Sequence, residues 1–151
     1  MSETLLSFYL NDRYLGVDIT RVKEMNRRVE YTVVPGAPPE VVGLLNLRGQ
    51  VVSLLDLNYL LSGEEAKPLN TGEVGMAKGC VVLKSWGGGD TSQVGFVIDQ
   101  PGDVVEVEES LCEPPPANLG GMDRGMVRKV ARLEANLLLI LDVDKLRHSQ
   151  P

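Results

Sequence analysis

The chain has 151 residues, of which 43% are hydrophobic and 5% aromatic, and its formal net charge at pH 7 is −6. This length suits one domain, or two small subdomains that share a core, and the hydrophobic content is enough to bury that core. The acidic balance and the scarcity of aromatic residues argue against nucleic acid as a partner, because a phosphate-binding surface needs clustered Lys and Arg.

Targeting and redox signals are weak throughout the chain. The opening MSETLLSFYLNDRY turns polar within a few residues, so it does not predict a signal peptide. No run approaches the roughly 20 apolar residues that span a bilayer. Cys80 and Cys112 are too few and too far apart for a metal site or a disulfide framework. We therefore expect a cytoplasmic protein with free thiols, no metal, no cofactor and no membrane insertion.

The first elements expected are two strands, Thr4–Leu10 and Tyr14–Asp18. Asn11-Asp12-Arg13 between them has turn chemistry, so the two strands should form a hairpin. Asp18 can then cap a short helical turn. The apolar residues that would share a face of this turn are Ile19, Val22 and Met25.

The next segment leads into the most apolar run of the chain. Tyr31–Val34 has strand character, and the proline-rich residues 35–39 form a loop, because proline lacks the backbone donor that a central strand needs. Gln50–Leu55 is a short Val- and Leu-rich run typical of a buried strand. Asp56 follows as an N-cap, with Leu57, Leu60 and Leu61 on one side of a helical turn.

The second half of the chain repeats this style of short elements. A polar loop is expected over residues 62–77, and a glycine-rich hairpin tip at Gly87-Gly88-Gly89-Asp90. The expected strands are Gly79–Ser85, Val94–Ile98, the segment of Val104, Val105 and Val107, Met126–Leu133, and Leu137–Leu141, before a final helical turn over Val143–Leu146. Glu106, Glu108 and Glu109 predict a solvated acidic edge.

Short strands with turn signals and only stubs of helix predict an all-β barrel or sandwich. A weak internal repeat adds detail, since residues 52–60 resemble residues 138–146, and residues 16–22 resemble residues 95–104. Each half therefore runs from an apolar strand to an Asp cap and a helical stub. We expect two similar small barrels, with an approximate boundary at residues 62–77 and some sharing of strands.

The charged residue Arg48 lies within the most apolar stretch, at an expected Arg48-Gly49 turn. A guanidinium between two apolar segments needs partners if it is buried. The alternative is that Arg48 turns outward where a strand begins.

The segment around this arginine forms a motif, Gly43-Leu44-Leu45-Asn46-Leu47-Arg48-Gly49, which is followed by an apolar strand ending in Asp56. This motif resembles the signature of CheW-type chemotaxis coupling proteins. Gly16-Val17-Asp18-Ile19, Gly95-Phe96-Val97-Ile98-Asp99 and Leu139-Ile140-Leu141-Asp142-Val143 extend the resemblance over nearly the whole chain. It implies a single CheW-like domain over residues 1–151, built from two five-stranded SH3-like barrels. Ser53, Pro101 and a longer Gly87–Gly89 tip depart from the family pattern.

The residues do not predict an enzyme. The one histidine, His148, lies three residues from the C-terminus, where a general base would lack support. The carboxylates Asp18, Asp56, Asp99 and Asp142 each follow an apolar run, which favours capping over an acid–base or metal cluster. The Gly87–Gly89 run lacks the Lys-Ser/Thr that a phosphate-binding loop needs.

The resemblance supplies partners for a non-catalytic binding module. It implies an adaptor between the cytoplasmic tips of methyl-accepting chemoreceptors and the regulatory domain of the CheA histidine kinase. The positions that match coupling residues of the family are Val22, Glu24, Gly43, Arg48 and Gly95. Arg48 could donate to a receptor carboxylate or to carbonyls at a helix end. Val22 could receive a helical hairpin, or be plain core, and the two glycines could serve only close backbone approach.

Two other functions remain open from the sequence alone. The chain could couple a different chemosensory array, such as one that governs pili, gliding or a second messenger, with the same fold and other partners. From a different class, it could be a small-molecule-binding or hydrolytic β-barrel, which converging acidic side chains in a pocket would favour.

Overall fold

The computed structural model describes residues 1–63, 74–84, 86, 93–119, 121–134 and 136–148. The elements of the first half are β1 (Ser2–Leu10), β2 (Arg13–Asp18), the 3₁₀ turn η1 (Ile19–Arg21), β3 (Val22–Thr32), β4 (Val41–Leu47), β5 (Gln50–Leu55) and α1 (Leu57–Ser62). Those of the second half are β6 (Val74–Leu83), β7 (Gln93–Ile98), β8 (Gln100–Glu108), η2 (Glu109–Leu111), β9 (Cys112–Glu113), η3 (Arg124–Met126), β10 (Val127–Arg132), β11 (Leu137–Leu141) and α2 (Val143–His148). The expected all-β class with short helices is confirmed.

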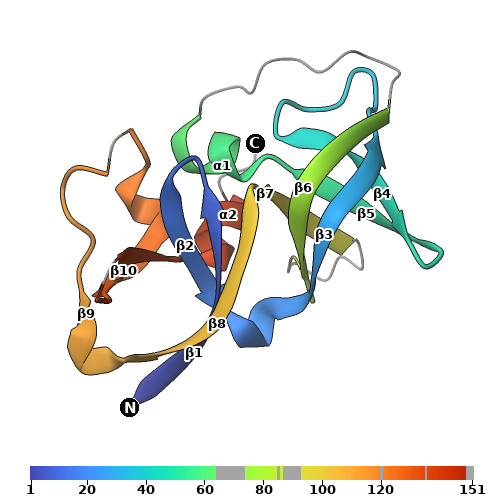
Figure 1. Ribbon diagram of the computed structural model, residues 1–151. Coiled ribbons are helices and arrows are strands. Elements are labelled where there is room, and N and C mark those ends of the chain that lie inside the picture. Colours follow the sequence, from blue (N-terminus) through green and yellow to red (C-terminus); the bar gives the residue numbers. More distant parts are fainter. Residues whose placement is uncertain (64–73, 85, 87–92, 120, 135, 149–151) are drawn as a thin grey trace.

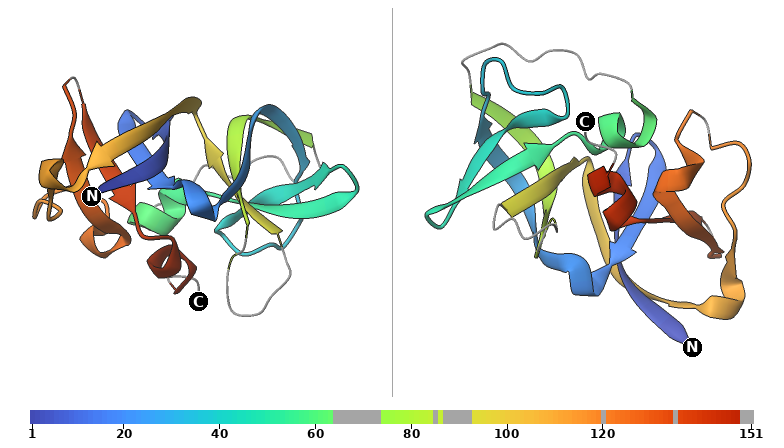
Figure 2. Two further views of the ribbon diagram at one scale, coloured as in Figure 1. Left: turned by 90° about the horizontal axis from the view of Figure 1, so that it is seen from below. Right: turned by 180° about the vertical axis from the view of Figure 1, so that it is seen from behind.

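Five strands close into a barrel in the order β3-β4-β5-β7-β6. Neighbouring strands are antiparallel except β5 and β7, which run parallel. The join between β3 and β4 is short, because among the described residues their ladder consists of the pair Thr32–Leu44. The barrel lies beside the other strands in Figures 1 and 2.

The remaining strands form a six-stranded sheet in the order β8-β1-β2-β11-β10-β9. β2 and β11 pair in parallel, so the N-terminal hairpin joins strands from the C-terminal third of the chain. The chain therefore crosses between the two units at residues 18–22 and 98–100. The sequence placed the boundary at residues 62–77, but β5, the last strand before that segment, and β6, which begins within it, both belong to the barrel. Local repeats do not reveal which distant strands pair.

The described residues form three hydrophobic clusters. The largest lies between the barrel and the sheet, where Phe96 and Leu83 from the barrel meet Phe8 and Leu15 from the sheet. A second fills the barrel and includes Val52 and Leu54. A third lies within the curled sheet and consists of Leu5, Val107, Ala131, Leu138 and Ile140. Because the first cluster draws on both units, the barrel and the sheet share one core.

The expected caps begin both short helices. Asp56 Oδ1 accepts a hydrogen bond from Tyr59 N at 3.3 Å, and Asp142 Oδ1 accepts one from Lys145 N at 3.1 Å. Asp18 likewise accepts from Thr20 N at 2.9 Å in η1. Asp99 differs, because its Oδ2 accepts from Asn11 N at 2.8 Å and so supports the β1–β2 turn. The strand, cap and helix repeat is thus present as β5–α1 and β11–α2.

Several expected elements need correction. Val22 and Met25 lie on β3, not on a helical turn, which is limited to η1. β3 runs as far as Thr32 and includes residues 27–30, where Arg28 has a φ of 50° that interrupts the usual alternation. β6 starts at Val74, inside the expected loop. The expected Gly87–Gly89 tip lies outside the described residues.

Pro101 occupies β8, the edge strand of the six-stranded sheet, opposite Phe8. A proline is tolerated there because an edge strand has main-chain groups that pair with no neighbour.

Candidate functional site

The β4–β5 hairpin turns tightly at Arg48 and Gly49, which lie between the paired residues Leu47 and Gln50. Both turn residues have positive φ, 51° for Arg48 and 84° for Gly49, as a two-residue type I′ hairpin turn requires. Asn46 Oδ1 accepts a hydrogen bond from Gly49 N at 3.0 Å and supports the turn. The Arg48 side chain is 68% exposed. The outward-pointing alternative is therefore the correct one for Arg48.

The guanidinium of Arg48 has a carboxylate partner within the chain. Its Nη2 forms an ion pair with Glu24 Oε2, and Asn26 Nδ2 donates to Glu24 Oε1 at 2.8 Å. Hydrogen bonding by Asn26, followed by that of Arg48, lowers the pKa of Glu24 against the opposing effect of burial. Glu24 is therefore ionised at neutral pH, and it orients Arg48 from the neighbouring strand β3.

A second polar group stands beside this pair. Lys23 Nζ donates to Gln50 Oε1 and Gln93 Oε1, each at 3.2 Å. Gln93 Nε2 also donates to Gln50 Oε1 at 2.7 Å. Together with Leu47, Glu24 and Arg48, these side chains line an open hollow of about 280 Å³. Lys23 was not among the predicted site residues, because its amide partners come from two strands that are distant in the sequence.

The other three predicted site residues do not present side chains at this surface. Val22 is 9% exposed and belongs to the cluster between barrel and sheet. A Cβ on Gly43 would lie 2.5 Å from the Thr32 carbonyl oxygen, and one on Gly95 would lie 3.3 Å from the Val81 carbonyl oxygen. Both glycines therefore allow close approach of strands. Of the five predicted residues, the structure brings Glu24 and Arg48 into contact.

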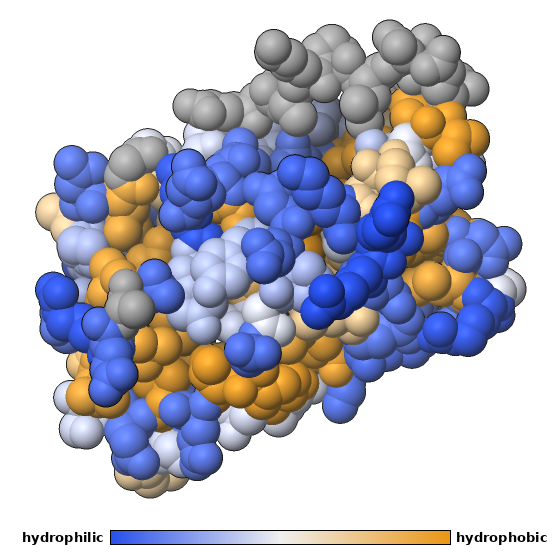
Figure 3. Space-filling model, in the orientation of Figure 1, coloured by the Kyte–Doolittle hydropathy of each residue, from blue (hydrophilic) through white to orange (hydrophobic). Residues whose placement is uncertain are grey.

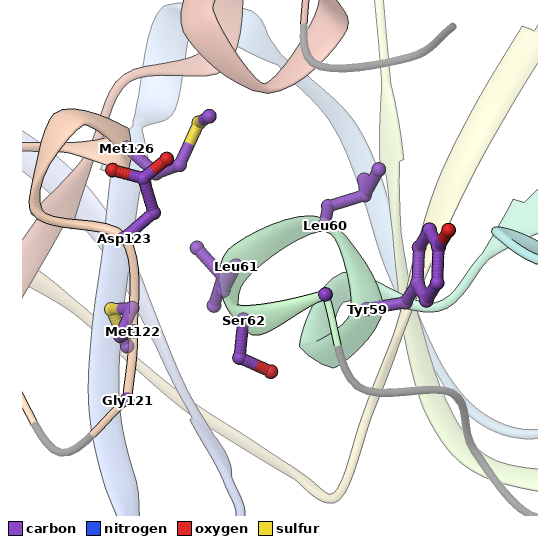
Figure 4. Close-up of a pocket in the computed structure, with 9 residues that line it drawn as sticks. Tyr59, Leu60, Leu61, Ser62, Gly121, Met122, Asp123 and Met126 are labelled. Atoms are coloured by element: carbon purple, nitrogen blue, oxygen red, sulfur yellow. The ribbon is translucent and has the colours of Figure 1, made fainter.

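A different hollow, of about 370 Å³, lies between α1 and the segment before β10 (Figure 4). Leu60 and Leu61 approach it from α1, and Met122 and Met126 from the opposite side. Asp123 is held there, because its N donates to the Leu61 carbonyl oxygen at 2.7 Å and its Oδ1 accepts from Gly125 N at 2.8 Å. Its carboxylate thus supports a turn, which is a structural role.

Hydrophobic side chains remain exposed on both units. On the barrel, Val51 in β5 is 59% exposed, and Val74 and Met76 in β6 are 61% and 60% exposed. Val104 in β8 of the sheet is 59% exposed. Figure 3 shows hydrophobic surface over β8 and over the upper end of β6. Where exposed apolar side chains form a contiguous patch, that patch commonly marks a contact surface.

Among the described residues, no group of three His, Cys, Asp or Glu side chains could hold a metal ion. No helix there is long and apolar enough to cross a membrane.

The barrel, the sheet and the exposed polar hairpin define a module built for contacts with other proteins. The model of the CheW-like domain matches residues 4–150, and the chain belongs to the CheW-like family. Chemotaxis protein CheW of Treponema pallidum is 29% identical over 97% of this chain and 82% of its own length. Chemotaxis protein CheW of Bacillus subtilis is 27% identical over 94% of this chain and 85% of its own length.

A solved structure shares the fold. The scaffolding protein TtCheW from Thermoanaerobacter tengcongensis superimposes with a TM-score of 0.74 at 23% identity, covering 97% of this chain and 92% of the other. The resemblance seen in the sequence is thereby confirmed. The chain is a chemotaxis coupling adaptor of the CheW-like family.

Proposed function

We propose that the chain links the cytoplasmic tips of methyl-accepting chemoreceptors to the regulatory domain of a CheA-type histidine kinase. It would do so in the cytoplasm, recruited to membrane receptor arrays. The observation that carries this proposal is the Arg48–Glu24 pair, an exposed and oriented charge at the tip of a rigid hairpin. Such a side chain loses little conformational freedom when a partner binds.

Two binding surfaces are needed for an adaptor, and both units carry exposed apolar side chains. Val51 and Met76 lie on the barrel, and Val104 on the sheet. A receptor on one surface and a kinase on the other would be held together at high effective concentration. A shift in the receptor would then bias the kinase between its active and inactive states.

The buried predicted residues fit the proposal indirectly. Val22 is buried between barrel and sheet and directly precedes Lys23 and Glu24 on β3, so it would set where that strand lies. Gly43 and Gly95 would preserve the barrel that displays the hairpin. We expect their substitution to weaken coupling through the fold, without loss of a direct contact.

The test is capture of both partners from native lysate by wild type and by Arg48→Glu, with folding checked by circular dichroism. Wild type should recover a CheA-type kinase and a receptor, and the folded variant should lose the receptor and abolish receptor-dependent kinase control. Arg28→Glu is the matched control, because Arg28 is also an exposed barrel arginine with positive φ. Full coupling by Arg48→Glu, or its unfolding, would refute the interface role of Arg48. Recovery of neither partner by wild type would refute the proposed function.

The internal ion pair requires one more variant. Arg48→Glu places two carboxylates face to face, which could move the hairpin. The double exchange Glu24→Arg with Arg48→Glu restores an ion pair in the opposite sense. If Arg48 contacts the receptor, the double variant stays uncoupled. If it regains coupling, the pair has a purely internal role.

A further inference from the structure

Lys23 is a cation at the hairpin surface that forms no ion pair within the described residues, although its charge is among the smaller causes that lower the pKa of Glu24. Arg48 in the same hollow pairs with Glu24, and the ion pairs of the described residues do not include Lys23. The partners of its ammonium group are the neutral amide oxygens of Gln50 and Gln93. The hollow therefore holds two cations and one carboxylate, in a chain whose net charge is −6.

Residues from three strands position the ammonium group of Lys23. Lys23 extends from β3, Gln50 lies at the start of β5 and Gln93 at the start of β7. The 2.7 Å hydrogen bond between Gln93 and Gln50 ties the two acceptors together. An ammonium group has three donors, and the amide oxygens take two of them. One donor is left for a group that enters the hollow from solvent.

We propose that this hollow binds the carboxylate of an Asp or Glu side chain of a partner protein, with Lys23 as the contacting cation. Charge complementarity argues for this occupant, since two cations and one carboxylate line the hollow and a carboxylate from a partner would balance the second cation. The inference rests on the proposed function, because it assigns the contact to a receptor docked at the hairpin. The contacting residue is not the one named in the proposed function, because Arg48 already forms an ion pair with Glu24 and Lys23 forms none within the described residues.

The measurement is affinity of the full chain for a purified receptor cytoplasmic fragment, at low and at physiological salt. Lys23→Gln should weaken binding about 5-fold, and Lys23→Glu about 10-fold or more, because the second change adds repulsion. Both variants should reduce the salt dependence of binding. Lys78→Glu is the matched control, an exposed lysine of the same barrel in β6 away from the hollow. It should bind as wild type does.

A charge exchange identifies the occupant. Each acidic residue of the receptor tip is changed to Lys in turn. One of these changed fragments should bind the Lys23→Glu protein more tightly than it binds the wild-type protein. If Lys23→Glu is weakened but no exchange restores it, the occupant is not a carboxylate side chain and the proposal fails. If Lys23→Glu binds normally while Arg48→Glu does not, the proposal fails and the proposed function stands. If wild type does not bind the fragment, the proposed function fails as well.

Discussion

Substitution of Gly43 can test whether this residue serves the fold or contacts a partner, because the atoms that a side chain would meet there are known. In Gly43→Ala the new methyl carbon would lie 2.5 Å from the Thr32 carbonyl oxygen and 2.7 Å from Tyr31 Cδ2. An ordinary carbon–oxygen contact is about 3.3 Å, so β4 would have to move away from β3 by about 0.8 Å. Thr32–Leu44 is the pair that joins these two strands, and this movement would break it.

The expected loss can be estimated from two contributions. Overpacking of a close contact costs about 1–3 kcal/mol, and a lost main-chain hydrogen bond about 1 kcal/mol. Gly43→Ala should therefore lower the free energy of unfolding by about 2–4 kcal/mol. With a urea m-value of about 2 kcal/mol/M, the midpoint should fall by about 1–2 M. Urea unfolding followed by circular dichroism measures this directly.

Gly95→Ala is the internal comparison, as its methyl carbon would meet Leu54 Cδ2 at 3.2 Å and the Val81 carbonyl oxygen at 3.3 Å. The leucine can give way, so the loss should be about 1 kcal/mol. A Gly43→Ala protein with the midpoint of wild type and no receptor binding would refute the reasoning, since Gly43 would then act at the interface itself.

Two further predictions concern pH and capping. Burial raises the pKa of Glu3, but its hydrogen bonds to Lys129 and Arg128 outweigh this and hold the pKa below its usual 4.5. Its contribution to stability is then complete above pH 4.5 and lost as the pH falls through the lowered value, so Glu3→Gln should reduce Tm at pH 7 and flatten its decline between pH 6 and pH 3. A decline as steep as that of wild type would contradict this. Burial raises the pKa of the capping carboxyl of Asp56, so its ionised form opposes folding as the pH rises through that value. Asp56→Asn, which keeps an acceptor for Tyr59 N, should be at least as stable as wild type at pH 7, whereas Asp56→Ala should lose about 1 kcal/mol in urea unfolding. Equal loss in both variants would show that the charge itself is required.

Local chemistry in the sequence predicted much of the fold. The Asn11–Asp12 and Arg48–Gly49 turns, the Asp56 and Asp142 caps and the strand–helix repeat depend on neighbouring residues, and all are present. β3 was missed because Arg28 adopts a left-handed conformation within the strand, so its alternation of buried and exposed residues is broken.

The site residues, like the fold, were predictable only where the signal is local in the sequence. Arg48 was found because its motif is contiguous, and Glu24 because the resemblance supplied it. Lys23 was missed, because its significance depends on Gln50 and Gln93, which reach it only when β5 and β7 pair in parallel. Parallel pairing between strands distant in sequence has no local signal.

The parallel pair of β2 and β11 has a consequence for the emerging chain. β2 ends at Asp18 and β11 begins at Leu137, so about 120 residues must be synthesised before the two strands can meet. At about 5–20 residues per second this takes roughly 6–24 s. During that time the barrel strands, which are continuous in sequence, can close. Leu5 of the first hairpin, whose hydrophobic cluster is completed by Ala131, Leu138 and Ile140 of the C-terminal strands, must wait without these neighbours. We expect the nascent hairpin to be the segment of this chain most in need of chaperone protection.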